Sequence, residues 1–167
     1  MNSINKIKSF VNGMGLIAVL SGGILFASAT RAMAHDTKCP YCQMAVIQDT
    51  KDQDNEVALK YGNKKIEYRC VMCAIAHAKT RYKDKADLTI VAPSPIKDKK
   101  VTIARKNGVW SSSPADAMFV FQKGGHDKCQ ELYRSAPDKA SADAWIAKSK
   151  LKDAKILNLK EMVEASK

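Results

Sequence analysis

Residues 56–82 read EVALKYGNKKIEYRCVMCAIAHAKTRY, and this stretch decides the fold that we expect. Its first part alternates apolar and polar residues up to Tyr61, turns at Gly62-Asn63, and resumes an extended pattern from Lys64 to Tyr68. Two such runs around a short glycine-containing turn are typical of a β-hairpin. The second part, Cys70 to Tyr82, is rich in alanine and lacks glycine and proline. It therefore predicts a helix that begins at a pair of cysteines.

The sequence on either side of this stretch adds short strands and three further helices. The strand candidates are residues 88–92, 101–105, 109–110 (after the turn signal Asn107-Gly108) and 156–157. The helix candidates are a short one capped by Ser113-Pro114 and carrying Ala117 and Met118, an amphipathic one over 138–150 with Ala142, Trp145 and Ile146 inward, and a terminal one capped by Asn158 and Glu161. We expect an α+β fold, a small antiparallel sheet with helices packed on one side.

The N-terminal 34 residues are typical of an export signal. Lys6 and Lys8 precede a mostly apolar run from Val11 to Phe26, and Ala32-Met33-Ala34 is a small-x-small cleavage site. The apolar run is short for a membrane-spanning helix, which needs about 20 residues, so an uncleaved anchor is the alternative. The segment contains no cysteine that could carry a lipid. We therefore predict a signal peptide over 1–34, a single metal-binding domain over 35–167, and a periplasmic or secreted protein.

The chain is strongly basic, with a formal charge of +11 that falls to +8 without the predicted signal peptide. Outside the cytoplasm, nucleic acid is not an expected partner. A basic surface is compatible with contact to an anionic membrane surface or to an acidic protein. We predict no oligomeric state from this sequence.

Two cysteine pairs lie in the predicted mature chain, Cys39-Pro-Tyr-Cys42 and Cys70-Val-Met-Cys73. The two-residue spacing lets both sulfurs of a pair reach one ion, and two such pairs form the general pattern of a four-thiolate site. The hairpin between them can bring the pairs together. On a helix that starts at Cys70, this residue, Cys73 and His77 fall within an arc of roughly 60°. In an extended chain, Cys42 and Met44 share a side.

These donors predict a soft metal ion. Thiolate and thioether sulfur together favour Cu(I), whereas four thiolates alone would also suit zinc or an iron–sulfur cluster. The candidate ligands are Cys39, Cys42, Met44, Cys70, Cys73, His77 and Cys129. Three other interpretations stay open: two disulfides that staple an exported domain, a structural Zn(II) site, and thiol–disulfide exchange at a CxxC motif.

Three residues outside the two pairs extend the set of candidates. An odd cysteine count leaves Cys129 as the unpaired thiol, and His126 stands three residues before it, after two glycines. His35 would be the amino terminus of the mature chain, where its amine and ring nitrogen could chelate Cu(II). For both histidines the alternative is a surface position without a ligand role.

Cys39-Pro-Tyr-Cys42-Gln43-Met44 resembles the CxxCGM signature of the NosL-like family, copper-binding accessory proteins of nitrous-oxide reductase assembly. The resemblance extends loosely over most of the mature chain. It implies a small α+β fold related to the metal-handling domain of organomercurial lyase, Cu(I) binding through sulfur, and transfer of copper to or from a partner protein rather than catalysis. We therefore expect a non-enzymatic copper chaperone or copper-resistance protein.

The sequence departs from the family pattern in four places. Gln43 replaces the glycine of the signature, the usual lipoprotein cysteine is missing, and the Cys70–Cys73 pair is additional. Cys129 falls roughly where the family tends to carry a methionine. The extra thiols indicate a richer site than the family pattern has.

Overall fold

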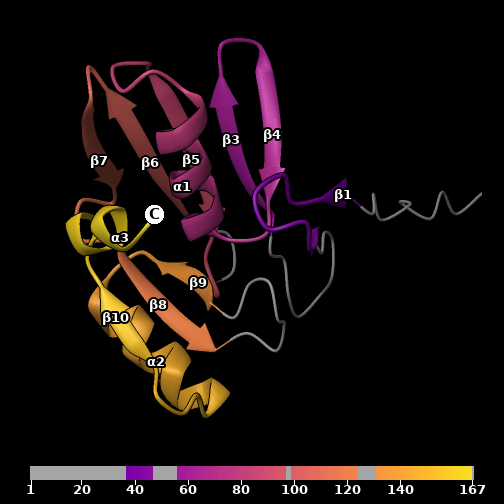
Figure 1. Ribbon diagram of the computed structural model, residues 1–167. Helices are drawn as coiled ribbons and strands as arrows, with labels where there is room; N and C mark the ends of the chain where they lie inside the picture. The colour runs from indigo at the N-terminus through magenta and orange to yellow at the C-terminus, as the bar shows by residue number, and fades with distance from the viewer. Residues whose placement is uncertain (1–36, 47–55, 97–98, 124–130, 167) are drawn as a thin grey trace, which may run out of the picture. The chain divides into compact units, whose positions relative to one another are not determined.

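The computed structural model describes residues 37–46, 56–96, 99–123 and 131–166, which all belong to one compact unit. Its largest sheet has five antiparallel strands in the spatial order β4-β3-β5-β6-β7 (Figure 1). These strands are β3 (Val57–Tyr61), β4 (Lys64–Tyr68), β5 (Leu88–Pro93), β6 (Lys100–Lys106) and β7 (Val109–Ser113).

Two smaller antiparallel sheets and three helices complete the described part of the chain. One sheet has the order β10-β8-β9, and the other pairs β1 with β2. The strands are β1 (Thr37–Lys38), β2 (Ala45–Val46), β8 (Met118–Lys123), β9 (Glu131–Ala136) and β10 (Lys155–Leu157), and the helices are α1 (Val71–Arg81), α2 (Lys139–Ser149) and α3 (Leu159–Ala165). Helix α1 contacts β3, β4 and β5 of the large sheet, whereas α2 contacts β8 and β9.

The hairpin turns follow from their residues. Gly62 opens the β3–β4 turn at a φ of 55°, and Tyr61 pairs with Lys64 across it. Asn107 and Gly108 connect β6 to β7 with φ values of 51° and 84°. Two consecutive positive φ values match the right-handed twist of a two-residue hairpin, and asparagine and glycine tolerate them best. Both predicted turns are present.

The predicted ends of the helices agree closely with the structure. Helix α1 lies between the caps Cys70 and Tyr82. The Asp138 side chain accepts a hydrogen bond from the Ser141 backbone N–H at the start of α2. Asn158 and Glu161 form the reciprocal capping box of α3. These local contacts use backbone N–H groups that have no partner inside their helix.

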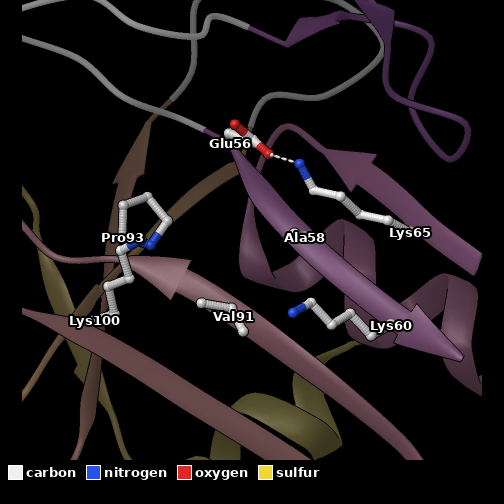
Figure 2. Close-up of a pocket in the computed structure, with 7 residues that line it drawn as sticks. All are labelled: Glu56, Ala58, Lys60, Lys65, Val91, Pro93 and Lys100. Carbon is white, nitrogen blue, oxygen red and sulfur yellow. Dashed lines mark hydrogen bonds and ion pairs between the residues drawn. The ribbon is translucent and has the colours of Figure 1, made fainter.

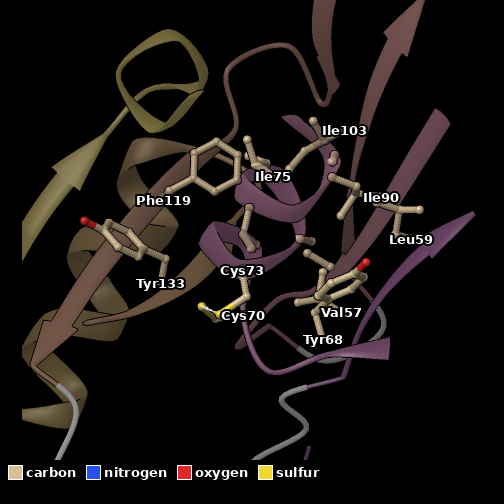
Figure 3. Close-up of a cluster of buried hydrophobic side chains, with 14 of the residues drawn as sticks. Val57, Leu59, Tyr68, Cys70, Cys73, Ile75, Ile90, Ile103, Phe119 and Tyr133 are labelled. Carbon is tan, nitrogen blue, oxygen red and sulfur yellow. Dashed lines mark hydrogen bonds between the residues drawn. The ribbon is translucent and has the colours of Figure 1, made fainter. Parts of the chain in front are cut away.

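The main core lies between the large sheet and α1. Leu59, Ile90 and Ile103 come from three neighbouring strands, and Ile75 comes from the helix; all four are fully buried in one cluster (Figure 3). At the start of α1, Figure 3 shows Cys70 and Cys73 at the edge of this cluster. A second, smaller core cluster contains Val120 from β8, Ala136 from β9 and Ala142 from α2. The cysteines of α1 are thus placed by an apolar core rather than by an exposed loop.

A buried arginine fixes the other end of α1. The guanidinium of Arg105, which is 2% exposed, donates hydrogen bonds to the carbonyls of Ala78, Lys83 and Ala86. It also lies 5.4 Å from the centre of the Trp110 ring. Because the last carbonyls of a helix lack intrahelical partners, a cation there satisfies them. Burial lowers the pKa of Arg105.

The α+β class with antiparallel sheets is confirmed, but one predicted helix is wrong. Ser113 ends β7, and Met118 begins strand β8 instead of lying in a short helix. The run Phe119-Val120-Phe121 explains the difference, because aromatic and β-branched side chains favour strands and here face two cores in alternation. Strands β8 and β9 were not predicted. Among the described residues, no helix is long and apolar enough to cross a membrane.

Candidate metal centre

The first cysteine pair lies on a tight loop between β1 and β2. The Cys39 backbone N–H donates to the Met44 carbonyl at 2.8 Å, and the Gln43 N–H donates to the Cys39 carbonyl, also at 2.8 Å. These two bonds close the loop and fix Cys39 on both sides. Gln43 adopts a φ of 62°, a left-handed conformation that is costly for a residue with a side chain. The loop therefore turns sharply after Cys42.

The second pair lies on α1. Cys70 is the N-cap and Cys73 follows in the first turn, with their sulfurs 3.5 Å apart. The Ala74 N–H donates to the Cys70 carbonyl at 3.2 Å, as expected for the first helical hydrogen bond. This pair is held by regular secondary structure, in contrast to the first.

The structure brings the two pairs together. The sulfurs of Cys39, Cys42 and Cys73 all lie within 4.8 Å of one another. Cys70 is outside this group of three but touches Cys73. All four are free thiols, and their residues are nearly inaccessible: Cys39 and Cys73 are 0% exposed, Cys70 1% and Cys42 7%. A cysteine cluster able to bind a metal ion is therefore present.

The four thiols share their protons unequally. Hydrogen bonding with Cys42, and then with Cys73, lowers the pKa of Cys39 well below its ordinary value. Hydrogen bonding with Cys73 lowers the pKa of Cys70 to about 7. The pKa of Cys73 is raised, first by its hydrogen bond with Cys39, and that of Cys42 is raised to about 12 by its hydrogen bond with Cys39. Two thiols thus ionise readily while two retain protons until a metal displaces them.

His77 lies beside the cluster but engages another partner. Its Nδ1 is 2.7 Å from the hydroxyl oxygen of Tyr68, and the two rings meet edge to face. Burial lowers the pKa of His77, and burial also raises that of Tyr68, with smaller contributions from Tyr82, Cys39 and Cys73. The fully buried Tyr68 is not among the predicted site residues. Only the contact between strand β4 and helix α1 reveals it, because no spacing in the sequence links residues 68 and 77.

The other candidates lie partly or wholly outside this cluster. Met44 is half-buried and packs against the main core, next to the cysteine loop that its carbonyl helps to close. His35, His126 and Cys129 lie outside the described residues. Their predicted roles stay predictions, as does the ligand role of each residue in the cluster.

A separate hollow lies on β3, β4, β5 and β6 (Figure 2). It has a volume of about 200 Å³ and contains no thiol. Its lining combines lysines with a carboxylate and small apolar residues: Glu56, Ala58, Lys60, Lys65, Val91, Pro93 and Lys100. Lys65 forms ion pairs with Glu56 at 2.6 Å and with Glu67 at 2.9 Å. This hollow is basic and open, unlike the buried cysteine cluster.

Comparison with known proteins gives a match of fold but no family. No family model and no curated protein matches the chain, so membership of the NosL-like family stays a prediction. Among solved structures, the chain is similar to the mercury-bound form of MerB2, with a TM-score of 0.53 and 10% identity. The match covers 65% of this chain and 54% of that chain, so it spans about half the length of MerB2. It confirms the organomercurial-lyase-like fold.

This match corrects one expectation. We expected a protein that is not an enzyme, but the fold is shared with an organomercurial lyase, which is an enzyme. The shared fold therefore gives no ground for excluding catalysis. Thiol–disulfide exchange stays a prediction. The described sheets are antiparallel, so the cysteine pairs do not lie in the parallel βαβ setting of thioredoxin-like redox proteins.

Proposed function

We propose that this protein binds a soft, thiophilic cation, preferentially Cu(I), through Cys39, Cys42 and Cys73, and exchanges it with a partner protein. The observation that carries the proposal is the convergence of these three buried, free sulfurs within 4.8 Å of one another. They come from two segments about 30 residues apart in sequence, and both the β1–β2 loop and helix α1 are needed to place them.

The spacing of the sulfurs suits a single shared ion. Metal–sulfur bonds of about 2.3 Å place two sulfurs of a tetrahedral site about 3.8 Å apart. A contraction of the cluster by less than about 1 Å would bring all three sulfurs into bonding distance. Because Cys70 lies outside the group of three, the site offers three thiolates first and a fourth nearby. Soft thiolate donors favour Cu(I), and a four-coordinate Zn(II) would require Cys70 to move in as well.

The surroundings of the cluster fit a soft ion too. In the part of the chain that the structure describes, the four cysteines belong to the main apolar core, and this core cluster includes no carboxylate, the donor that harder ions prefer. The mercury bound in the MerB2 structure is likewise a thiophilic ion, so a solved example of this fold is compatible with one. With the predicted export signal, the proposal describes a periplasmic or secreted copper chaperone or copper-resistance protein.

The test is Cu(I) binding by the full chain after anaerobic reduction, measured by competition with a chromogenic Cu(I) chelator while free thiols are counted. We expect one tightly bound Cu(I) and a corresponding loss of reactive thiols. The double variant Cys39→Ser/Cys73→Ser should lose tight binding. Cys129→Ser, which also removes a thiol but leaves the described cluster intact, should retain it. Purified protein that is permanently cross-linked at these cysteines, or that ignores Cu(I), would refute the proposal.

A second candidate function is cleavage of a carbon–mercury bond, favoured by the fold shared with MerB2. In such a step thiolates bind mercury, the carbon–mercury bond breaks, and the carbon takes the proton of a neighbouring thiol. The cluster holds both kinds of group, because Cys39 and Cys70 ionise readily whereas Cys73 keeps its proton. Release of benzene from phenylmercury by the reduced protein, measured by gas chromatography, would support this candidate. Stoichiometric binding without benzene would exclude it.

A further inference from the structure

The four sulfurs differ in how they are held. Cys70 and Cys73 belong to α1, whose first turn is packed into the main core. Cys39 is held by two backbone hydrogen bonds of 2.8 Å, one through its N–H and one through its carbonyl. Cys42 is held differently, because it lies in the turn itself, just before the left-handed Gln43.

The four also differ in access to solvent. Cys42 is 7% exposed, whereas Cys39, Cys70 and Cys73 are at most 1% exposed. The two residues before Cys42 in the loop are much more exposed: Pro40 is open to solvent, and Tyr41 is 39% exposed. An incoming donor can therefore approach the cluster over the tip of this loop. Helix α1 and the core close the approach to the two helical sulfurs.

We propose that Cys42 is the exchange ligand of the site: it forms the first bond to an incoming metal ion and is the first ligand displaced when a partner removes the ion. This inference rests on the proposed function and specifies its mechanism. In uptake, the Cys42 thiol loses its proton as its sulfur bonds to Cu(I), and the donor's thiolate leaves and takes up a proton. No electrons are transferred. Cys39 and Cys73 then bind from inside and hold the ion.

A matched pair of variants on the same loop tests this inference. Cys42→Ser and Cys39→Ser each remove one sulfur of the group of three, but only the first removes the least buried one. Uptake of Cu(I) from its glutathione complex is followed by stopped-flow spectroscopy. We expect Cys42→Ser to slow the second-order uptake rate roughly tenfold, and Cys39→Ser to leave that rate within about twofold while accelerating release. Equal uptake rates in the two variants would overturn the inference.

A second measurement needs no variant, so it remains valid if a substitution disturbs the fold. The reduced wild-type protein is loaded with one Cu(I) and treated with iodoacetamide, and the order of alkylation is read by mass spectrometry. We expect Cys42 to react before Cys39, Cys70 and Cys73. Reaction at any of these three before Cys42 would overturn the inference. If the wild-type protein binds no Cu(I), the proposed function itself fails, and the binding measurement shows this independently.

Discussion

The two cysteine pairs share one spacing but lie in opposite structural settings. Cys39 and Cys42 lie on a loop between two-residue strands, closed by backbone hydrogen bonds and by a left-handed Gln43. Cys70 and Cys73 lie at the start of an eleven-residue helix packed on the main core. The comparison shows that identical motifs can contribute differently to one site. The helix supplies two fixed sulfurs, and the loop supplies Cys42, the least buried of the four.

The largest expected effect separates the two sulfurs of the helix. Cys73 belongs to the group within 4.8 Å, whereas Cys70 only touches it. We expect Cys73→Ser to weaken Cu(I) affinity roughly 100-fold, or about 2.7 kcal/mol, and Cys70→Ser to weaken it only about tenfold. Chelator competition measures both. Equal losses would show that the four sulfurs form one symmetric site, in which Cys70 and Cys73 bind the ion equally.

The second effect concerns proton sharing between the two cysteines of the helix, Cys70 and Cys73. The hydrogen bond with Cys73 lowers the pKa of Cys70 to about 7, so Cys73→Ala should return the pKa of Cys70 toward its ordinary value of 9. Thiolate absorbance at 240 nm of the metal-free protein is the measurement. We expect a titration step near pH 7 in the wild type that moves to higher pH in the variant.

The same shift has a consequence for stability. A pKa that is lower in the folded state stabilises the protein above the unfolded pKa of 9, and this contribution is lost as the pH falls through 7. The raised pKa of Cys42 acts in the opposite direction: it stabilises the fold below pH 9, and the contribution is lost as the pH rises toward 12.

The control for the absorbance titration of Cys73→Ala is Cys42→Ala, because this variant should leave the step near pH 7 in place. A step unchanged in Cys73→Ala would contradict the assignment.

The third effect concerns the hydrogen bond between Tyr68 on strand β4 and His77, which lies on α1 four residues after Cys73. Tyr68→Phe keeps the buried ring but removes the hydrogen bond to Nδ1 of His77. We expect a loss of about 1 kcal/mol in the free energy of unfolding, measured with chemical denaturant. Tyr82→Phe, which changes a hydroxyl on a neighbouring ring without this bond, is the matched control. A comparable loss in the control would show that the Tyr68 hydroxyl has no special role.

Much of this architecture could be predicted because local signals determine it. Turn residues fixed both hairpins, and the alanine-rich run fixed α1 to within one residue of its predicted ends. Strands β8 and β9 escaped prediction because β8 is buried on two sides, so Phe119-Val120-Phe121 shows no simple alternation. The approach of Cys39 and Cys42 to Cys73 depends on long-range packing. Spacing made the convergence plausible but could not show that Cys70 would stand apart from the other three.

The smallest effect tests the strain on the loop side of the comparison. Gln43 has a φ of 62°, at the position where the CxxCGM signature carries glycine. Because a left-handed backbone costs a residue with a Cβ about 1 kcal/mol, Gln43→Gly should raise the free energy of unfolding by roughly 0.5–1 kcal/mol. Gln43→Ala removes the same side-chain hydrogen bond to the Pro40 carbonyl but keeps the Cβ, so it should give no such gain. Denaturant unfolding of the metal-free proteins measures both. If glycine destabilises the protein as much as alanine does, the loop is not strained at Gln43.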